Sequence, residues 1–198
     1  MEKNGGIIMK YEDIKTPEDL YIFMRNNFRY GYLSNIDSDK HIREEMNDDE
    51  LYEKILFNNF YLQTPRELLK SKCGICYDQV EFERKWFSDH NYPTKTFYTP
   101  YKNHAFLIYK DDDKYKLFER TVKEFNGIHI GNSVEELLEA YKEKQLKDVE
   151  LDDIDFYSYN NATFGKDFNT LIKNIVKDNN ISEKIIKCVN DKVPFYSK

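Results

Sequence analysis

The sequence predicts an α+β fold formed by one domain over residues 1–198, with residues 1–10 as a flexible start. Two observations predict this fold class. Apolar residues recur at helical spacing before about residue 87 and again after residue 133, whereas residues 95–130 hold short runs of β-branched and aromatic residues. Helices and strands therefore form separate blocks, which is typical of α+β proteins and not of doubly wound sheets. The apolar fraction of 40 % is enough for a real core.

Two of the expected helices begin with the same signal. In Thr16-Pro17-Glu18-Asp19 and in Thr64-Pro65-Arg66-Glu67, Thr occupies the N-cap, Pro takes the first turn and an acid follows. Glu67 is placed to complete a capping box. We expect the first helix to end at Gly31 and the second, shorter helix to end near Ser71.

The other elements follow from spacing and composition. Helical patterns cover residues 51–59, 76–87, 166–177 and 182–190, and a capping box at Ser133-Val134-Glu135-Glu136 opens one more helix. Strand-like runs cover residues 96–99, 104–109, 115–121 and 128–130. The chain therefore places a meander of strands between two groups of helices.

The charge balance limits the class of partner. With 36 acidic against 30 basic residues the formal net charge is -6, and no basic stripe is present, so the sequence does not predict nucleic-acid binding. The longest apolar run near the N-terminus, Ile7-Ile8-Met9, is too short for a secretory signal, and no run approaches the ~18 residues of a membrane span. We therefore expect a cytoplasmic protein without a membrane partner. Three Cys residues do not form a disulfide framework.

The segment Cys73-Gly74-Ile75-Cys76 points most directly to chemistry. It delivers Cys76 to the first turn of an expected helix, where the helix dipole favours a thiolate. The N–H of Cys76 lies in the unbonded first turn and is free to donate to an oxyanion. Gly74 would allow backbone and substrate to approach closely.

His104 and Glu119 are the expected partners of this thiol. They lie on two strand-like runs joined by a polar turn, in which Asp111 faces Lys114 if residues 112 and 113 form the tip. In that register Glu119 faces Phe106, so Glu119 and His104 fall on one face of the hairpin as diagonal neighbours. A slip of one residue would separate them. The sequence thus predicts a nucleophile, a base and an acid that orients the base.

These residues resemble the transglutaminase-like superfamily over roughly residues 64–121. The resemblance rests on Gly74-Ile75-Cys76 before a helix, on His104-Ala105-Phe106 on a strand, and on an acid that ends the next strand. It implies a papain-like core, with the nucleophile at a helix N-terminus packed on an antiparallel sheet, and a triad formed by Cys76, His104 and Glu119. The family usually has Asp at the position of Glu119 and Trp at the position of Phe106. Gln63 and Gln79 are both candidates for the oxyanion side chain.

Other readings of the same residues stay open. Cys73 and Cys76 form a CxxC pair, which suggests a dithiol redox site, but a thioredoxin-like fold needs an apolar strand before the motif and the sequence predicts a short helix there. Zinc needs about four ligands, and no second pair completes a site. Cys188 is expected in a helical core. His90 and His129 are expected to be structural, with His129 as the reserve candidate for the base.

The sequence therefore predicts a cysteine-dependent enzyme that acts on an amide or related acyl bond of a peptide, a protein or a small molecule. No cofactor and no metal are implied. The main alternative is a noncatalytic protein-binding module on the same fold, and the dithiol redox protein is the second. Hydrolysis and transfer to an amine are not distinguished by the sequence, nor is the oligomeric state.

Overall fold

The computed structural model describes residues 9–33, 40–42, 59–99, 104–145 and 156–159, together with residues 170 and 173. Several predictions lie wholly or largely outside these residues. They are the flexible start, the helices at 51–59, 166–177 and 182–190, and the placement of Cys188. Residues 170 and 173 are helical, as is Asn59.

The two Thr-Pro signals each open a helix. In α1 (Pro17–Asn27), Thr16 Oγ1 accepts from the Asp19 N–H at 3.1 Å, and the Asp19 carboxylate accepts from the Thr16 N–H at 3.0 Å. The same reciprocal box, between Thr64 and Glu67, opens α3 (Pro65–Ser71). Both helix starts are confirmed.

The predicted end of α1 is wrong by one turn. The helix stops at Asn27, and the chain extends at Phe28 with φ -108° and ψ 133°. Arg29 then bridges to Cys73, and Gly31 opens the short strand β1 (Gly31–Leu33), which pairs with β2 (Lys40–Ile42). The long-range bridge to Cys73 therefore ends the helix before the glycine is reached.

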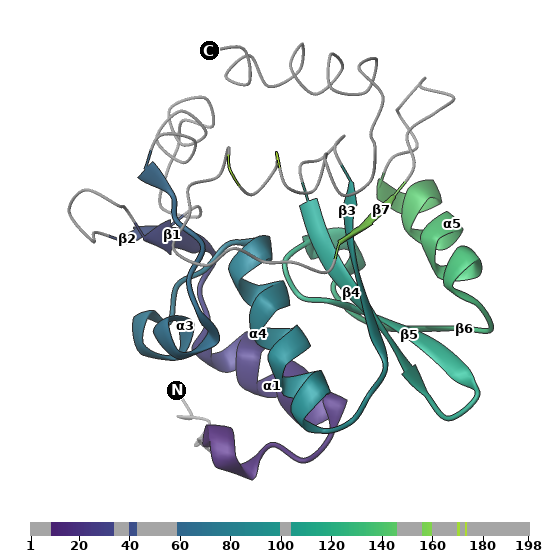
Figure 1. Cartoon of the computed structure of the whole chain (residues 1–198), viewed down its shortest axis with the longest axis horizontal. Coiled ribbons are helices and arrows are strands. Elements are labelled where there is room, and N and C mark those ends of the chain that lie inside the picture. Colours follow the sequence, from purple (N-terminus) through teal and green to yellow (C-terminus); the bar gives the residue numbers. More distant parts are fainter. Residues whose placement is uncertain are drawn as a thin grey trace, which may run out of the picture.

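A five-stranded antiparallel sheet forms the centre of the molecule, in the order β6-β5-β4-β3-β7 (Figure 1). Its strands are β3 (Thr94–Thr99), β4 (His104–Asp111), β5 (Lys114–Glu119), β6 (Gly127–Gly131) and β7 (Tyr157–Tyr159). The other named elements within the described residues are α4 (Cys76–Asp89), α5 (Val134–Gln145) and two short 3-10 helices, η1 (Tyr11–Asp13) and η3 (Lys123–Phe125). The α+β class is confirmed. Strand β7 was not predicted because three residues are too few to carry a pattern.

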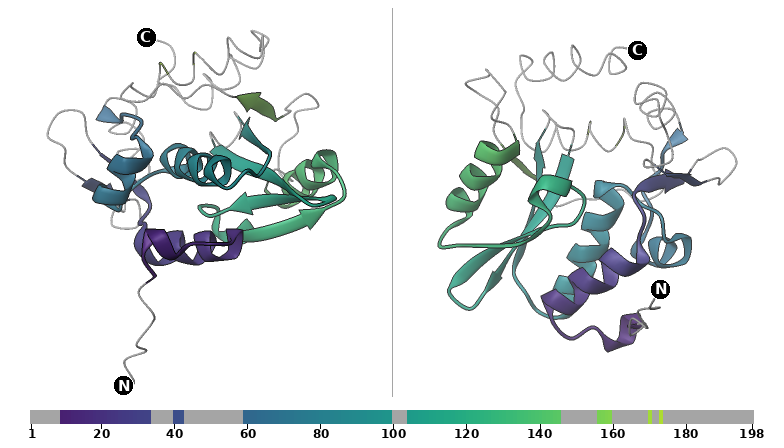
Figure 2. Two further views of the ribbon diagram at one scale, coloured as in Figure 1. Left: turned by 60° about the horizontal axis from the view of Figure 1, so that its bottom comes forward. Right: turned by 180° about the vertical axis from the view of Figure 1, so that it is seen from behind.

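Helices cover both faces of the sheet (Figures 1 and 2). On one face α1 and α4 pack against Ala105, Leu107 and Tyr109 of β4, in the larger apolar cluster. On the other face α5 contributes Leu137 and Tyr141 to a second cluster, which includes alternate residues of the same strand. Because side chains alternate along a strand, β4 is buried on both faces.

The helix α5 begins with half of the predicted capping box. Ser133 Oγ accepts from the Glu136 N–H at 3.1 Å, as expected. The Glu136 carboxylate instead accepts from the backbone and side-chain N–H groups of Asn132, at 2.8 and 3.0 Å. The Glu136 carboxylate therefore binds Asn132, whereas in a capping box it would accept from the N–H of the next residue, Ser133.

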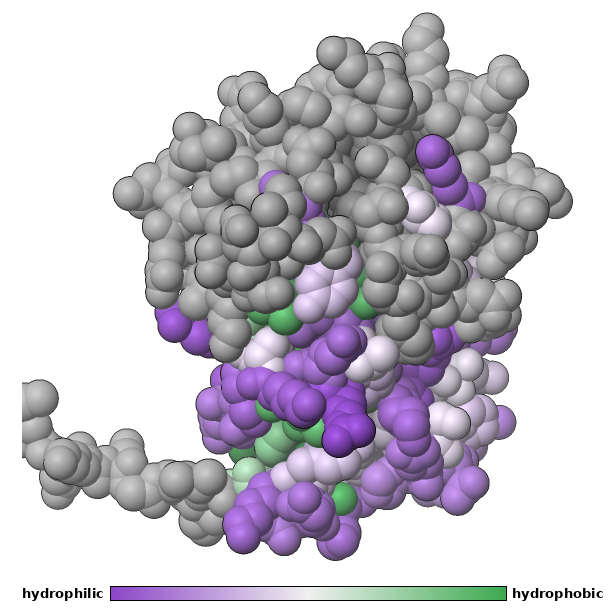
Figure 3. Space-filling model, turned by 60° about the vertical axis from the view of Figure 1, so that its left-hand side comes forward, coloured by the Kyte–Doolittle hydropathy of each residue, from purple (hydrophilic) through white to green (hydrophobic). Residues whose placement is uncertain are grey.

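The surface agrees with the interspersed charges of the sequence. On the face seen in Figure 3 hydrophilic side chains predominate among the described residues, and the hydrophobic ones form small separate spots. Among the described residues, no helix combines the length and the apolar character that crossing a bilayer requires.

Candidate active site

The loop before α4 fixes where Cys76 lies. Lys72 ends α3 in the left-handed region with φ 58°, and the next residues lie against Arg29, whose N–H donates to Lys72 O at 2.9 Å and whose carbonyl accepts from the Gly74 N–H at 3.1 Å. A Cβ at position 74 would lie 2.6 Å from Leu68 Cδ1 and 2.9 Å from Asp78 Cβ. Glycine is therefore required here for packing within the fold, and not for approach of a substrate.

Asp78, in the first turn of α4, holds the start of this helix in place. Its carboxylate accepts from the Ile75 N–H at 3.0 Å and from the Gln63 N–H at 2.9 Å. Burial is the main influence on this group and raises the pKa of Asp78 to about 8, while the two hydrogen bonds oppose the rise. One buried carboxyl group therefore links the α4 N-terminus to the segment before α3.

The two glutamines predicted as oxyanion candidates also hold the loop. Gln63 Nε2 donates to Cys73 O at 2.8 Å, and Gln79 Nε2 donates to Gly74 O at 2.8 Å. Both side chains are buried. In these contacts the amide nitrogens serve the backbone around the thiol, so neither residue is assigned to an oxyanion.

Cys76 is the first residue of α4 and is 2 % exposed. Its N–H has no acceptor within the helix, because the first turn leaves its donors unbonded. The positive end of the helix dipole lies at the same point. Thiol and N–H thus occupy the place that the sequence predicted.

The hairpin of β4 and β5 has the predicted register. Asp111 pairs with Lys114 and Leu107 pairs with Phe118, and Asp112 at the tip adopts φ 53°. His104 begins β4 and Glu119 ends β5, so both lie at the same end of the hairpin. Their side chains meet there, with 2.8 Å between His104 Nε2 and Glu119 Oε2.

Glu119 also ends its own strand. Its second oxygen, Oε1, accepts from the Thr121 N–H at 2.7 Å, from the Thr121 hydroxyl at 3.1 Å and from the Val122 N–H at 3.0 Å. These bonds turn the chain, so β5 stops at Glu119 and not at Thr121 as predicted. Burial alone would raise the pKa of Glu119, but the charge and hydrogen bond of His104 and the backbone donors lower it.

His104 is buried between Glu119 and Cys76. Burial disfavours the charged ring, but the negative charges of both neighbours and hydrogen bonds with both side chains outweigh it and raise the pKa of His104. Because Nε2 is bound to Glu119, Nδ1 is the ring nitrogen left for the sulfur. The Tyr141 ring lies parallel to the imidazole, with 3° between the planes and 6.2 Å between the ring centroids.

A family model described as a transglutaminase-like domain matches residues 7–151, which is more than half of the chain. The chain belongs to the transglutaminase-like family. The match contains the whole of residues 64–121, on which the resemblance was based, and confirms it. A search of curated proteins found no significant match to this transglutaminase-like chain.

The other His and Cys candidates lie apart from this arrangement in the transglutaminase-like domain. His90 Nδ1 pairs with Trp86 O at 2.8 Å, and His129 Nε2 pairs with Phe125 O at 2.8 Å, each within its own local segment. Cys73 is buried in the loop, and the helix α3 precedes it where a thioredoxin-like site would need a strand. Within the described segments, no three His, Cys, Asp or Glu side chains gather as a metal ion requires.

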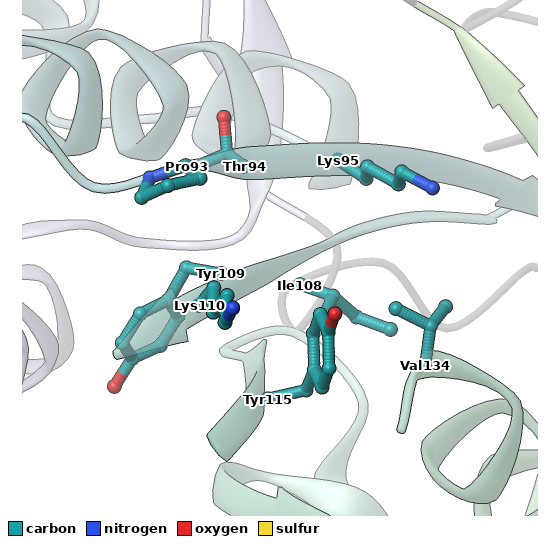
Figure 4. A pocket seen from close by; sticks show the side chains of 8 residues that line it. All are labelled: Pro93, Thr94, Lys95, Ile108, Tyr109, Lys110, Tyr115 and Val134. Atoms are coloured by element: carbon teal, nitrogen blue, oxygen red, sulfur yellow. The ribbon is translucent and has the colours of Figure 1, made fainter. Parts of the chain in front are cut away.

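Two hollows lie at opposite ends of the sheet. The larger, of about 210 Å³, is mostly apolar and lies against Ile108, Tyr115 and Val134, with Lys95 beside it (Figure 4). It is formed by the start of β3, the end of β4 and the start of β5, away from His104. The narrower hollow lies at the candidate active site. Its polar lining consists of Cys76, Gln79, Glu83, Glu119, Arg120 and Thr121.

Glu83 is the residue of this site that the sequence reasoning missed. It lies two helical turns after Cys76 on α4 and is 2 % exposed. The signal was present, because position 83 falls on the same helical stripe as Cys76 and Val80, where an acid interrupts an otherwise apolar face.

Proposed function

We propose that this transglutaminase-like domain is a cysteine-dependent acyl-transfer enzyme that cleaves an amide or peptide bond. Cys76 is the proposed nucleophile, His104 the base and Glu119 the residue that orients the base. The observation that supports this most is the position of one imidazole, with 2.8 Å between its Nε2 and a buried carboxylate and its other side hydrogen-bonded with the Cys76 side chain.

The reaction follows from this arrangement. His104 takes the thiol proton, and the Cys76 sulfur attacks the substrate carbonyl to give a tetrahedral oxyanion. The C–N bond then breaks, the imidazolium returns the proton to the leaving amine, and a thioester remains on Cys76. Water, activated by His104, attacks the thioester, releases the acid and restores the thiol. If an amine attacks in place of water, the product is a new amide.

Glu119 assists the proposed reaction by its charge and by its position. Its carboxylate stabilises the imidazolium that forms when the thiol is deprotonated, and its bond to Nε2 directs Nδ1 to the sulfur. The longer side chain of Glu, where the family usually has Asp, still reaches the ring. The Cys76 N–H, at the start of α4, is the proposed donor to the oxyanion.

An ester with a good leaving group tests the nucleophile without knowledge of the natural substrate. Incubation with 4-nitrophenyl acetate should release nitrophenolate and add one acetyl group to the protein, which mass spectrometry of the intact chain and of its peptides locates on Cys76. Cys73→Ser is the matched control, because it changes the neighbouring buried thiol and should keep the adduct. Cys76→Ala should lose it.

Three results would contradict the proposal. An adduct that persists in Cys76→Ala would place the reactivity elsewhere. Loss of the adduct in Cys73→Ser would favour the dithiol reading. Absence of both an adduct and nitrophenolate release above the uncatalysed rate on the folded protein would favour the binding module.

Hydrolysis and transfer are separated at the thioester. Hydroxylamine added during turnover intercepts an acyl group as a hydroxamate, whereas water gives acetate. A ratio that favours the hydroxamate far beyond that of a small-molecule thioester would identify an acceptor site for amines.

A further inference from the structure

The buried carboxyl group of Glu83 is not used by the proposed reaction. It lies on the side of α4 that faces the sheet, and among the described residues none donates a hydrogen bond to its Oε2 atom, which is removed from solvent. An ionised carboxylate in such a buried place is costly, because this oxygen lacks a donor there to stabilise its charge. A protonated carboxyl group avoids that cost.

Glu83 shares the narrow hollow of the active site. Its neighbours there include Cys76 on its own helix and Glu119 and Arg120 at the end of β5. The hollow is narrow, so little solvent screens these groups from one another.

The charged and titratable groups that act on Glu83 come from each element around it. They are Cys76 on α4, His104 on β4, Glu119 and Arg120 after β5, and Tyr159 on β7. Burial is the largest influence and raises the pKa of Glu83 well above its ordinary value. The charge of Glu119 raises it further, and the positive charges of Arg120 and His104 oppose this.

The total charge of the site indicates what a proton on Glu83 would do. When the thiolate and the imidazolium form, they cancel each other, and the negative charge of Glu119 and the positive charge of Arg120 together add no net charge to the site. An ionised Glu83 would leave the enclosed site with an excess negative charge beside the sulfur. A second nearby anion opposes thiolate formation, as in any pair of acids that share one site.

We propose that Glu83 is a positioning residue of this site, a carboxyl group that stays protonated while Cys76 and His104 carry their charges and so keeps a second negative charge away from the sulfur. The inference rests on the proposed function, since it concerns the same thiol. It adds a residue that acts through Cys76 and His104 and does not itself contact the substrate. The two carboxyl groups of the site thus have opposite protonation states, Glu119 ionised and Glu83 neutral.

Infrared spectroscopy tests the protonation state directly. The spectrum of the protein labelled with ¹³C-glutamate should show the carbonyl stretch of a protonated carboxyl group at pH 7, and Glu83→Gln should lose it. Glu81→Gln is the matched control, since Glu81 is a buried acid of the same helix that pairs with Arg84 and lies outside the hollow. Glu83→Met, neutral and of similar size, replaces the Gln variant if the latter does not fold.

The reactivity of Cys76 tests the coupling. As pH rises, ionisation of Glu83 should disturb the thiolate, so the rate of Cys76 alkylation by iodoacetamide should show two inflections in the parent protein and in Glu81→Gln. Glu83→Gln should show a single titration. A purely structural role for Glu83 would not remove an inflection.

Absence of the carbonyl band in the parent protein, or the same number of inflections in the parent and Glu83→Gln, would overturn the inference. The infrared result does not depend on whether Cys76 is a nucleophile. Failure of the inference is therefore distinguishable from failure of the proposed function.

Discussion

His104 connects the sheet, the acid and the helix of the proposed site. It is the first residue of β4, its Nε2 is hydrogen-bonded with Glu119, and its ring is also hydrogen-bonded with the side chain of Cys76 on α4. Each neighbour favours the charged ring, and burial opposes it. In the proposed reaction, these effects together determine how readily His104 accepts the thiol proton of Cys76.

Replacement of Glu119 by Gln should shift this balance. Glutamine keeps the shape but removes the charge that raises the pKa of His104, so the imidazolium is less stable and the thiolate appears at higher pH. We expect the midpoint of the pH profile of Cys76 alkylation to rise by about one pH unit. Glu124→Gln, on an exposed turn of η3, is the control for loss of a carboxylate and should not move it. An unchanged profile in Glu119→Gln would exclude an electrostatic role for Glu119.

At the level of single residues, the sequence predicted that Cys76, His104 and Glu119 would lie together. The structure brings them together because a helix start and a hairpin register constrain where side chains point. Glu83 was missed because an acid on a helical stripe is read as solvated unless its burial is known. The roles of Gln63 and Gln79 depend on the exact path of the loop, which no periodicity describes.

Among the elements, α4 depends most on its first turn. Asp78 accepts from the N–H groups of both Ile75 and Gln63, and is fully buried. Asp19 occupies the equivalent position in α1 and accepts from the Thr16 N–H at the surface. The Thr16 side chain completes the capping box of α1, whereas the Ile75 side chain has no acceptor, so the two helices share the acid at the third position in two environments.

Asp78→Asn should destabilise the protein more than Asp19→Asn. An amide offers one acceptor oxygen, so one buried N–H would lose its partner and face a donor, which costs about 1–3 kcal/mol. The exposed box of α1 should lose about 0.5–1 kcal/mol. Denaturant unfolding of both variants measures the difference. Equal losses would show that the buried box adds no stability beyond an ordinary cap.

The hairpin of β4 and β5 shows how far local patterns determine an element. Two turn residues and the alternation of side chains were enough to place every described pair of its ladder. The ends of elements were less predictable, because they depend on distant contacts. α1 ends where Arg29 meets Cys73, and β5 ends where the Glu119 carboxylate binds the two residues that follow.

For the whole molecule, the block order of helices and strands was sufficient to predict the α+β class, and the motifs around Cys76, His104 and Glu119 carried the family resemblance. It did not predict β7, which joins the sheet beside β3 through the pairing of Phe97 with Ser158. Three residues form a strand there because an edge of the sheet is available to them. That information belongs to the assembled sheet and not to the segment.

The pH dependence of the free energy of unfolding should reveal the raised pKa of Glu83. The pKa of this buried acid is raised in the folded state, so its contribution to stability is complete below its ordinary pKa of about 4.5 and is lost as pH rises. The free energy of unfolding of Glu83→Gln, compared with that of the parent protein, should therefore increase by about 1.4 kcal/mol for each pH unit above that point, until Glu83 ionises in the folded state. Denaturant unfolding at several pH values between 5 and 8 measures this difference. A difference that does not change with pH would show that Glu83 titrates alike in both states.

The central claim is that folding brings the Cys76 sulfur to an imidazole steadied by a carboxylate, so that His104 takes the thiol proton and makes Cys76 reactive. The rate of Cys76 alkylation by iodoacetamide as a function of pH, located by peptide mass spectrometry, tests it most directly. The account predicts alkylation near pH 6 that is roughly ten-fold faster than in His104→Ala. Alkylation that begins only above about pH 8, the range of an ordinary thiol, and does so equally in both proteins, would contradict it.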